Sequence, residues 1–120
     1  MKFLCIYKPG RPEGTPPGQE EIAKMGKLIE ESMQSGILLA TEGCLPSALG
    51  AKIRLSGDKF TVTDGPFTET KEIVGGFALI RTESKQEAIE STKRFLEIAG
   101  SGETEIRQVY EAANAAPRKP

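Results

Sequence analysis

Hydrophobic residues gather into short consecutive runs along the chain, and segments rich in glycine, proline and charged residues separate them. Short apolar runs that are bounded by turn residues predict β-strands. We expect strands at Lys2–Lys8, Ile37–Cys44, Phe77–Thr82 and Glu105–Tyr110. Two further runs, Ala51–Leu55 and Phe60–Thr63, flank a polar Ser-Gly-Asp-Lys turn and predict a β-hairpin.

Two segments instead repeat hydrophobic residues every three or four positions, which is the period of an amphipathic helix. The first helix is expected over Gln19–Ser35, and Gly36 ends it. Its apolar face consists of Ile22, Met25, Ile29 and Met33. The second helix begins with a capping-box pattern, Ser84 followed by Glu87, and ends at Gly100. Its apolar face consists of Ala88, Ile89, Thr92, Phe95, Leu96 and Ala99.

The order of these elements predicts an α+β fold. A strand–helix–strand series precedes the hairpin, and another series of the same kind follows it. Without the hairpin the order is βαββαβ, which is the ferredoxin-like plan. That plan places both helices on one face of an antiparallel sheet. We expect a single domain over residues 1–110 and a frayed tail over residues 111–120.

Three of the predicted strands are apolar at consecutive positions, as in the Leu-Cys-Ile-Tyr run of the first strand. Successive side chains of a strand point to opposite faces of the sheet, so both faces should be apolar. Two helices cover only one face, and the other would expose an apolar patch too large for a stable monomer. We therefore expect a homodimer, in which a second copy packs against the uncovered face sheet to sheet.

Composition narrows the functional classes. The 120 residues carry a net charge of −1 and no basic run, which argues against a nucleic-acid partner. No apolar run is long enough to span a membrane or to form a signal peptide, so we expect a cytoplasmic protein with no membrane partner. The chain has no histidine, which excludes Ser-His and Cys-His nucleophiles and the common zinc-hydrolase sites. Cys5 and Cys44 lie far apart, and we expect neither a metal nor another cofactor.

One loop carries more chemistry than a connection between strands needs. The stretch VTDGPFTETKEIVGGF combines glycine and proline with charged residues. Asp64 is either a turn residue beside Gly65, or a carboxylate with a raised pKa that acts as a general base. Lys71 and Glu72 either pair across the two-fold axis of a dimer, or belong to a site in which Lys71 holds an anionic ligand. Phe67 is expected to return the loop to the core.

Glu42 interrupts an otherwise apolar strand, where a carboxylate must be paired or must line a cavity. Arg54, in the hairpin, is its expected partner. The two residues form either a buried salt link or a clamp in which Arg54 binds the carboxylate of a ligand and Glu42 orients it. Tyr7 ends the first strand and can offer its phenol to the same cavity.

The same residues carry a resemblance to a known family. The segment Asp64-Gly65-Pro66-Phe67, followed by Thr70-Lys71-Glu72 and Gly75-Gly76, resembles the signature of the DGPF-domain proteins, which belong to the YCII-related family. The resemblance extends to Glu42-Gly43 and Arg54, and its element order covers roughly residues 1–110. It implies a ferredoxin-like α+β fold that pairs into a dimeric α/β barrel, with a ligand cleft near the dimer interface.

The resemblance also implies candidate functions. A few YCII-related proteins take part in the dehalogenating degradation of chlorinated aromatics, and a His-Asp pair is suggested as catalytic in others. That pair cannot be transferred to a chain without histidine. DGPF-domain proteins are often encoded beside sigma factors of the extracytoplasmic-function class, which suggests a regulatory role by association.

We therefore expect a dimer that binds a small anionic or phenolic ligand, with lyase, isomerase or dehalogenating activity through cleft carboxylates. The alternative is a non-catalytic binding or regulatory module with the same fold. Asp64 is the expected catalytic carboxylate. The expected ligand-binding residues are Tyr7, Glu42, Arg54, Asp64, Gly65, Phe67, Lys71 and Glu72.

Overall fold

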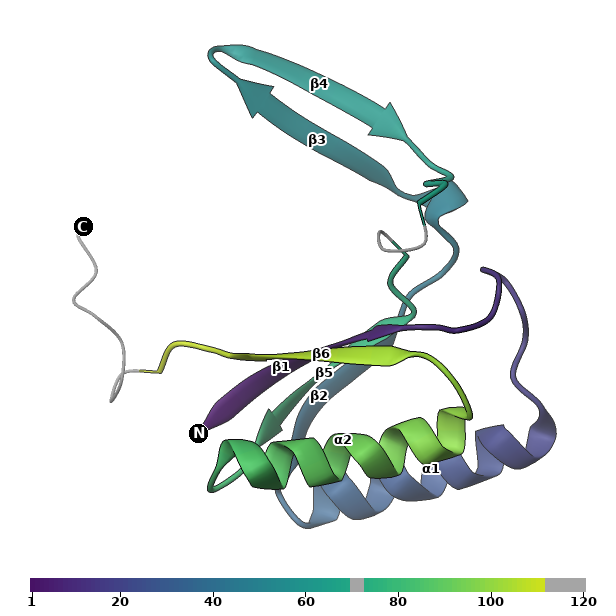
Figure 1. Ribbon diagram of the computed structural model, residues 1–120, viewed down its shortest axis with the longest axis vertical. Helices are drawn as coiled ribbons and strands as arrows, with labels where there is room; N and C mark the ends of the chain where they lie inside the picture. The colour runs from purple at the N-terminus through teal and green to yellow at the C-terminus, as the bar shows by residue number, and fades with distance from the viewer. Residues whose placement is uncertain (70–72, 112–120) are drawn as a thin grey trace.

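The computed structural model describes residues 1–69 and 73–111, and the elements predicted from the sequence are present in the predicted order (Figure 1). They are β1 (Lys2–Lys8), α1 (Gln19–Gln34), β2 (Leu38–Gly43), the short 3-10 helix η1 (Ser47–Leu49), β3 (Ala51–Ser56), β4 (Lys59–Asp64), β5 (Gly76–Arg81), α2 (Lys85–Ala99) and β6 (Glu103–Gln108). Of the frayed tail expected over residues 111–120, only Glu111 lies within the described residues, and its carboxylate accepts a hydrogen bond from the Arg81 Nη1 at 2.8 Å.

The last strand begins and ends two residues earlier than predicted, because its register follows β1. Lys8 of β1 lies opposite Glu103, and Phe3 lies opposite Gln108, so the partner strand sets both ends of β6. Gly102, with a φ of 105°, makes the turn that leads into the strand. A side-chain pattern alone does not contain this constraint.

Local sequence signals account for α2. The Ser84 Oγ accepts a hydrogen bond from the Glu87 amide at 3.1 Å, and Gly100 ends the helix with a φ of 83°. By contrast, α1 begins after Gly18 without a side-chain cap. Neither helix, nor any other in the described ranges, has the length and apolar character needed to cross a membrane.

The inner face of α1 is rotated from the predicted face. Ile22 and Met33 are exposed, whereas Met25 and Ile29 face the sheet together with Leu28. No residue of α1 is fully buried. The helix therefore covers the sheet without packing closely against it.

Four strands form one antiparallel sheet in the order β2-β5-β1-β6, and both helices cover the same face of it (Figure 1). Alternate residues of the central strands point toward the helices. The core is built around Phe3, Cys5 and Ile80 from the sheet and Ala88 from α2. This arrangement confirms the α+β class, with the helices on one side of an antiparallel sheet.

The opposite face of this sheet is apolar at its centre. In the register of β1 and β5, Leu4 lies opposite Leu79 and Ile6 lies opposite Phe77. Because Phe3 points toward the helices, strand alternation turns these four residues to the other side. We call them the outer face, and neither α1 nor α2 covers it (Figure 1).

Strands β3 and β4 form a separate two-stranded sheet that projects from the body (Figure 1). The hairpin is closed by the predicted turn, in which Ser56 pairs with Lys59 and Gly57 adopts a φ of 63°. Every residue of both strands is exposed. We call this hairpin, residues 51–64, the arm.

The Asp-Gly-Pro-Phe motif lies at the base of the arm. The Gly65 amide donates to the Gly50 carbonyl at 3.0 Å, and the Phe67 amide donates to the Ser47 Oγ at 2.9 Å. Phe67 is half-buried there, with the Lys52 Nζ 4.7 Å from its ring centroid, rather than inserted into the main core as expected. The motif therefore fixes the point at which the arm leaves the body.

Candidate ligand pocket

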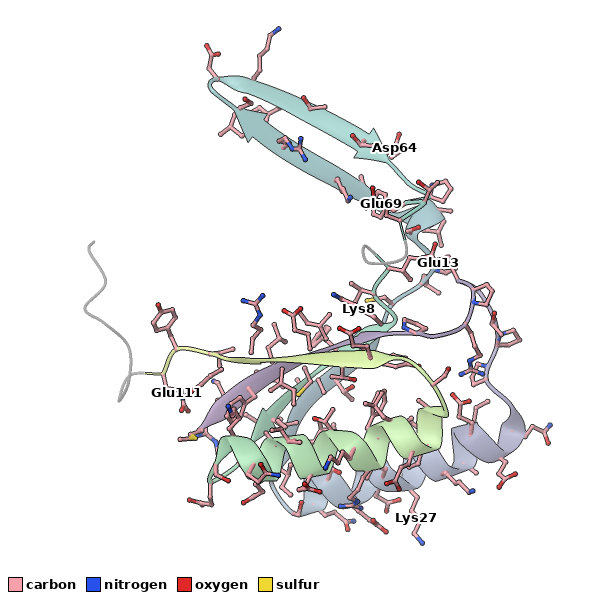
Figure 2. The ribbon with its side chains drawn as sticks, viewed as in Figure 1. Lys8, Glu13, Lys27, Asp64, Glu69 and Glu111 are labelled. Atoms are coloured by element: carbon pink, nitrogen blue, oxygen red, sulfur yellow. The ribbon has the colours of Figure 1, made fainter. Side chains whose placement is uncertain are left out.

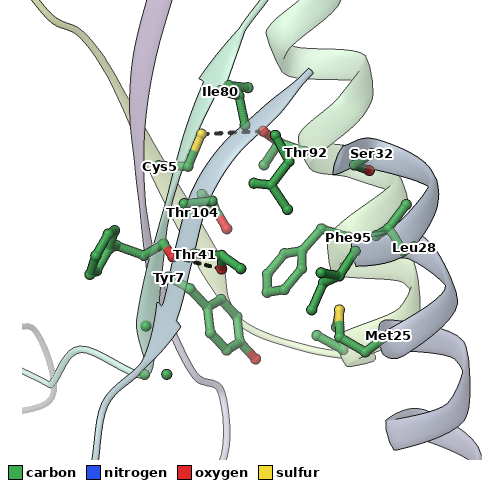
Figure 3. Close-up of a pocket in the computed structure, with 18 of the residues that line it drawn as sticks. Cys5, Tyr7, Met25, Leu28, Ser32, Thr41, Ile80, Thr92, Phe95 and Thr104 are labelled. Carbon is green, nitrogen blue, oxygen red and sulfur yellow. Dashed lines mark hydrogen bonds between the residues drawn. The ribbon is translucent and has the colours of Figure 1, made fainter. Parts of the chain in front are cut away.

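A pocket lies between the two helices and the sheet face that they cover (Figure 3). Its cavity volume is about 400 Å³, which falls in the range of small-molecule sites. The lining is mainly apolar, with a few polar groups among the apolar side chains. Its apolar walls include Met25, Leu28, Ile29, Ile80 and Phe95, and its polar groups include Tyr7, Glu21, Thr41, Thr92 and Thr104. The pocket exists because α1 spans the sheet without filling the space beneath it.

Three glycines, Gly43, Gly75 and Gly76, line one end of the pocket. A Cβ added to Gly76 would lie 2.8 Å from the Glu42 carbonyl oxygen, so glycine keeps β5 close to β2 at this point. The Gly75 amide also donates to the Tyr7 carbonyl at 2.8 Å. The Gly-Gly pair therefore shapes the end of the pocket through close backbone approach.

Tyr7 is held firmly at the pocket. Its hydroxyl donates to the Ser101 carbonyl at 3.0 Å, and its ring packs edge to face with Phe95 at a centroid distance of 5.0 Å. Burial raises the pKa of Tyr7 above its ordinary value of 10.0, an effect that the nearby Arg11 guanidinium opposes and Glu21 reinforces. The phenol is therefore protonated at neutral pH, and its oxygen remains able to accept a hydrogen bond.

An ion pair lies beside Tyr7. The Arg11 Nη2 donates to both carboxylate oxygens of Glu21 at 3.1 Å, and Glu21 itself lines the pocket. Arg11 comes from the Pro- and Gly-rich loop, and Glu21 comes from the first turn of α1. A fixed ion pair therefore lies next to the phenol, with its carboxylate in the lining of the apolar cavity.

Three small polar side chains lie deeper in the pocket (Figure 3). The Thr92 hydroxyl donates to the Ala88 carbonyl at 2.8 Å, and the Cys5 Sγ lies 4.0 Å from the same hydroxyl oxygen. Burial raises the pKa of Cys5 above its ordinary value of 9.0, so the thiol is protonated and is not an activated nucleophile at neutral pH. The Thr104 Oγ1 is buried and has no hydrogen-bond partner among the residues that the structure describes.

The residues predicted from the sequence to form one site fall into separate places. Tyr7 and Glu42 line the pocket. Arg54 and Asp64 lie on the arm, with Asp64 at the end of β4 (Figure 2). Gly65 and Phe67 lie at the base of the arm, whereas Lys71 and Glu72 fall outside the described residues.

The expected buried pair of Glu42 and Arg54 is wrong for the single chain. Both residues are exposed, and no ion pair between them is present in the described part of the protein. The physical reason is the pairing of the strands. Glu42 lies opposite Phe77 at the margin of the main sheet, whereas the strand that carries Arg54 pairs only with β4.

Sequence reasoning missed the residues that give the pocket its polarity, namely Arg11, Glu21, Cys5 and Thr104. Arg11 lies in a loop without periodicity, and Glu21 lies on a helix rich in solvated charges. The alternation of side chains along β1 could have predicted the position of Cys5, because Phe3, Cys5 and Tyr7 point to the same face of the sheet. No sequence signal distinguishes Thr104 from an ordinary strand threonine.

Metal binding finds no support in the arrangement of side chains. Across residues 1–69 and 73–111, no group of three or more His, Cys, Asp or Glu side chains is placed to hold an ion. The features that define the pocket are therefore its hydrogen-bonding groups and its apolar walls.

Known proteins are similar to this chain over nearly its whole length. The family model of the YCII-related domain matches residues 1–113. Among solved structures, the chain is similar to the 5-chloro-2-hydroxyhydroquinone dehydrochlorinase TftG from Burkholderia phenoliruptrix AC1100, solved in complex with 2,5-dihydroxybenzoquinone. The two share 16% identity at a TM-score of 0.47, over 97% of this chain and 100% of the other. None of the curated proteins compared with the chain matches it.

Proposed function

This chain belongs to the YCII-related family, and we propose that it binds a small, largely apolar molecule in the pocket between its sheet and its helices. The pocket has the size of a small-molecule site and contains few polar groups, which is the usual composition of such sites. The polar groups lie at two levels, Thr104 within the cavity and the Tyr7–Arg11–Glu21 group at the rim. A ligand that matches both levels carries at least two polar atoms.

The observation that carries the proposal is the Thr104 hydroxyl. Its oxygen is buried in an apolar cavity without a hydrogen-bond partner. A buried polar group left unsatisfied costs about 1–3 kcal/mol, so such groups are rare and need an explanation. A ligand that offers a hydrogen bond to this oxygen would remove the cost.

The rim indicates the second polar atom of the ligand. The Tyr7 hydroxyl donates to the Ser101 carbonyl, so toward a ligand hydroxyl its oxygen acts as an acceptor. The Arg11 guanidinium lies close enough to lower the pKa of Tyr7 and, although it is paired with Glu21, has further N–H donors for an anionic group. The site therefore suits a phenolic or small anionic compound with an apolar ring in the cavity.

Ligand binding without catalysis is the function that the geometry supports best. The expected catalytic carboxylate, Asp64, lies on the arm rather than in the pocket wall. The pocket carboxylate Glu21 is tied to Arg11 by two hydrogen bonds, which disfavours a role in proton transfer. Lyase, isomerase or dehalogenating activity is a second proposal, in which a bound ligand reaches either the Glu42 carboxylate in the pocket lining or Asp64 on the arm.

We further propose that residues 1–110 form one ferredoxin-like domain with the arm as an insertion, and that two copies pair as a dimeric α/β barrel. The strand order β2-β5-β1-β6 with both helices on one face supports the first part. The uncovered outer face supports the second, since its apolar side chains need a partner in water.

A titration of phenol and of benzoate against the parent and two variants tests the binding proposal. We expect saturable binding of at least one compound by the parent, and an affinity about tenfold lower for Thr104→Val, the usual worth of one hydrogen bond. Thr63→Val, on the exposed arm, is the matched control and should bind like the parent. Equal affinities for the parent and Thr104→Val would show that the Thr104 hydroxyl does not contact the ligand. If the parent binds neither compound, the proposal of a phenolic or anionic ligand is contradicted.

A further inference from the structure

One face of the arm carries four exposed apolar side chains, with Ala51 and Asp64 on the same face at the end nearest the body. The register pairs Ile53 with Val62 and Leu55 with Phe60, so these four side chains lie together on one side of the hairpin. Their exposed fractions are 70% for Ile53, 62% for Val62, 58% for Leu55 and 71% for Phe60. The other side carries Arg54 and polar residues, so the arm is amphipathic, and its four apolar side chains are exposed in the described part of the protein.

The arm has no core of its own. An isolated two-stranded hairpin is at best marginally stable in water, and a third strand or another packed element is normally needed. Hydrogen bonds join the arm to the body at its base, where the Gly65 amide donates to the Gly50 carbonyl and the Phe67 amide donates to the Ser47 hydroxyl. An apolar surface of this kind on an ordered hairpin is typical of an interaction site.

A second unpartnered apolar surface lies on the same side of the molecule. Figure 1 shows both helices on one side of the main sheet and the arm rising on the opposite side, toward which the outer face is turned. Figure 2 shows the arm carrying its side chains into open space. A single chain therefore presents two apolar surfaces on the same side of the main sheet, the exposed arm and the partly exposed outer face (Figure 1).

These two surfaces match in size and chemistry. Each arm strand has six residues and spans about 20 Å, which is close to the length of the six- and seven-residue strands of the main sheet. A two-fold axis brings each surface of one copy to the other surface of its partner, so that both contacts form twice. A partner of a different kind would have to cover both apolar surfaces separately, and each contact would form only once.

We propose that the arm packs against a second copy of this chain. The apolar side chains of the arm then contact the margin of the partner's outer face. This inference rests on the homodimer proposed above but not on ligand binding. It identifies the arm as the element that extends the interface beyond the sheet. The arm's polar side, with Arg54, then remains in solvent.

Light scattering at low micromolar concentration tests whether the arm contributes to dimer formation. The parent should give twice the 13.0 kDa chain mass. Ile53→Ser with Phe60→Ser removes apolar surface from the arm, and we expect its dimer dissociation constant to rise at least about tenfold. Arg54→Ser with Lys59→Ser, on the same hairpin, is the matched control and should leave the constant unchanged. A dimer that is equally tight in both double variants would overturn the role of the arm and leave sheet pairing intact, and a monomeric parent would overturn both proposals.

Cross-linking locates the contact even if the serine variant folds poorly. In a Cys44→Ser background, proteins carrying Leu55→Cys on the arm and Glu42→Cys on the edge strand β2, opposite the outer-face residue Phe77, are mixed and oxidised. A covalent dimer with one chain of each kind is the expected product. Exclusive self-linking of the Leu55→Cys protein would indicate arm-to-arm packing and would contradict the proposal, as would the absence of any linked product.

Discussion

The Glu13 carboxylate binds Ser47 through both of its oxygens. Its Oε1 accepts from the Ser47 amide at 2.7 Å, and its Oε2 accepts from the Ser47 hydroxyl at 2.7 Å. The same hydroxyl oxygen accepts from the Phe67 amide at 2.9 Å. The Pro- and Gly-rich loop, the 3-10 helix and the Asp-Gly-Pro-Phe motif are therefore joined at one point, which is the base of the arm.

Replacing Glu13 with alanine should loosen this junction. Two charge-assisted hydrogen bonds are lost, and since the carboxylate is only half-buried we expect a loss of about 1–2 kcal/mol of local stability. Hydrogen exchange at the Ser47 amide should accelerate accordingly. Glu20→Ala removes an exposed carboxylate that pairs only with Lys24 on the helix surface, and it should leave this amide unchanged. Equal exchange rates in both variants would mean that Glu13 does not hold the base.

Gly65 is predicted to tolerate no side chain. A Cβ at this position would collide with the Ser47 carbonyl oxygen, which is backbone and cannot move independently. We expect Gly65→Ala to lower the free energy of unfolding by about 2–3 kcal/mol, as for an overpacked site, with the midpoint read from urea unfolding.

Gly26→Ala is the control for this change. A Cβ there meets nothing within 4 Å, and the position lies inside α1. The same substitution should therefore stabilise the protein by about 0.5–1 kcal/mol through helix propensity. A stable Gly65→Ala protein would show that the arm base can shift without cost.

Thr104→Val should have opposite effects on stability and on binding. Removing a buried oxygen that has no partner should raise the free energy of unfolding of the ligand-free protein by about 1 kcal/mol. The same variant should bind the ligand less well, since the acceptor or donor for its polar atom is gone. Thermal unfolding with and without phenol measures both effects. A Thr104→Val protein that is less stable without ligand would show that the hydroxyl is already satisfied.

Alkaline pH should weaken the fold through the pocket. Burial raises the pKa of Cys5 above 9.0 and that of Tyr7 above 10.0, so the folded protein holds both protons more tightly than the unfolded chain does. The stability is therefore fully present below about pH 9 and falls as the pH rises through the folded pKa values. Cys5→Ala should lose less stability than the parent between about pH 8 and pH 10.5. Parallel losses in the two proteins would contradict the assignment to Cys5.

The sequence predicted the elements well, because their signals are local. Ser84 and Glu87 mark the start of α2, and Gly100 marks its end, without reference to the rest of the chain. The alternation around Leu4 and Ile6 likewise indicated an apolar outer face. The ends of β6 are set by its pairing with β1, and there the predicted strand boundaries were wrong by two residues.

The candidate site was harder to predict, because it depends on contacts between distant segments. The presence of Glu42 and Arg54 suggested a pair, but nothing in the sequence says that the hairpin leaves the body as an arm. The pocket arises from the loose packing of α1, and Arg11 and Thr104 contribute to it only through the fold. Tyr7 was identified because its place at the end of a strand is visible in the pattern.

The most direct test of ligand binding in this pocket is the reactivity of Cys5. This thiol lines the pocket and is 6% exposed, whereas Cys44, the other cysteine, is exposed and is replaced by serine for the experiment. The measurement is the rate at which a small methanethiosulfonate reagent modifies Cys5, with and without a saturating compound that binds. We predict that the bound compound slows the modification by at least about tenfold, since it occupies the route to the thiol. An unchanged rate at saturation would show that the compound binds elsewhere and would contradict the pocket as the functional site.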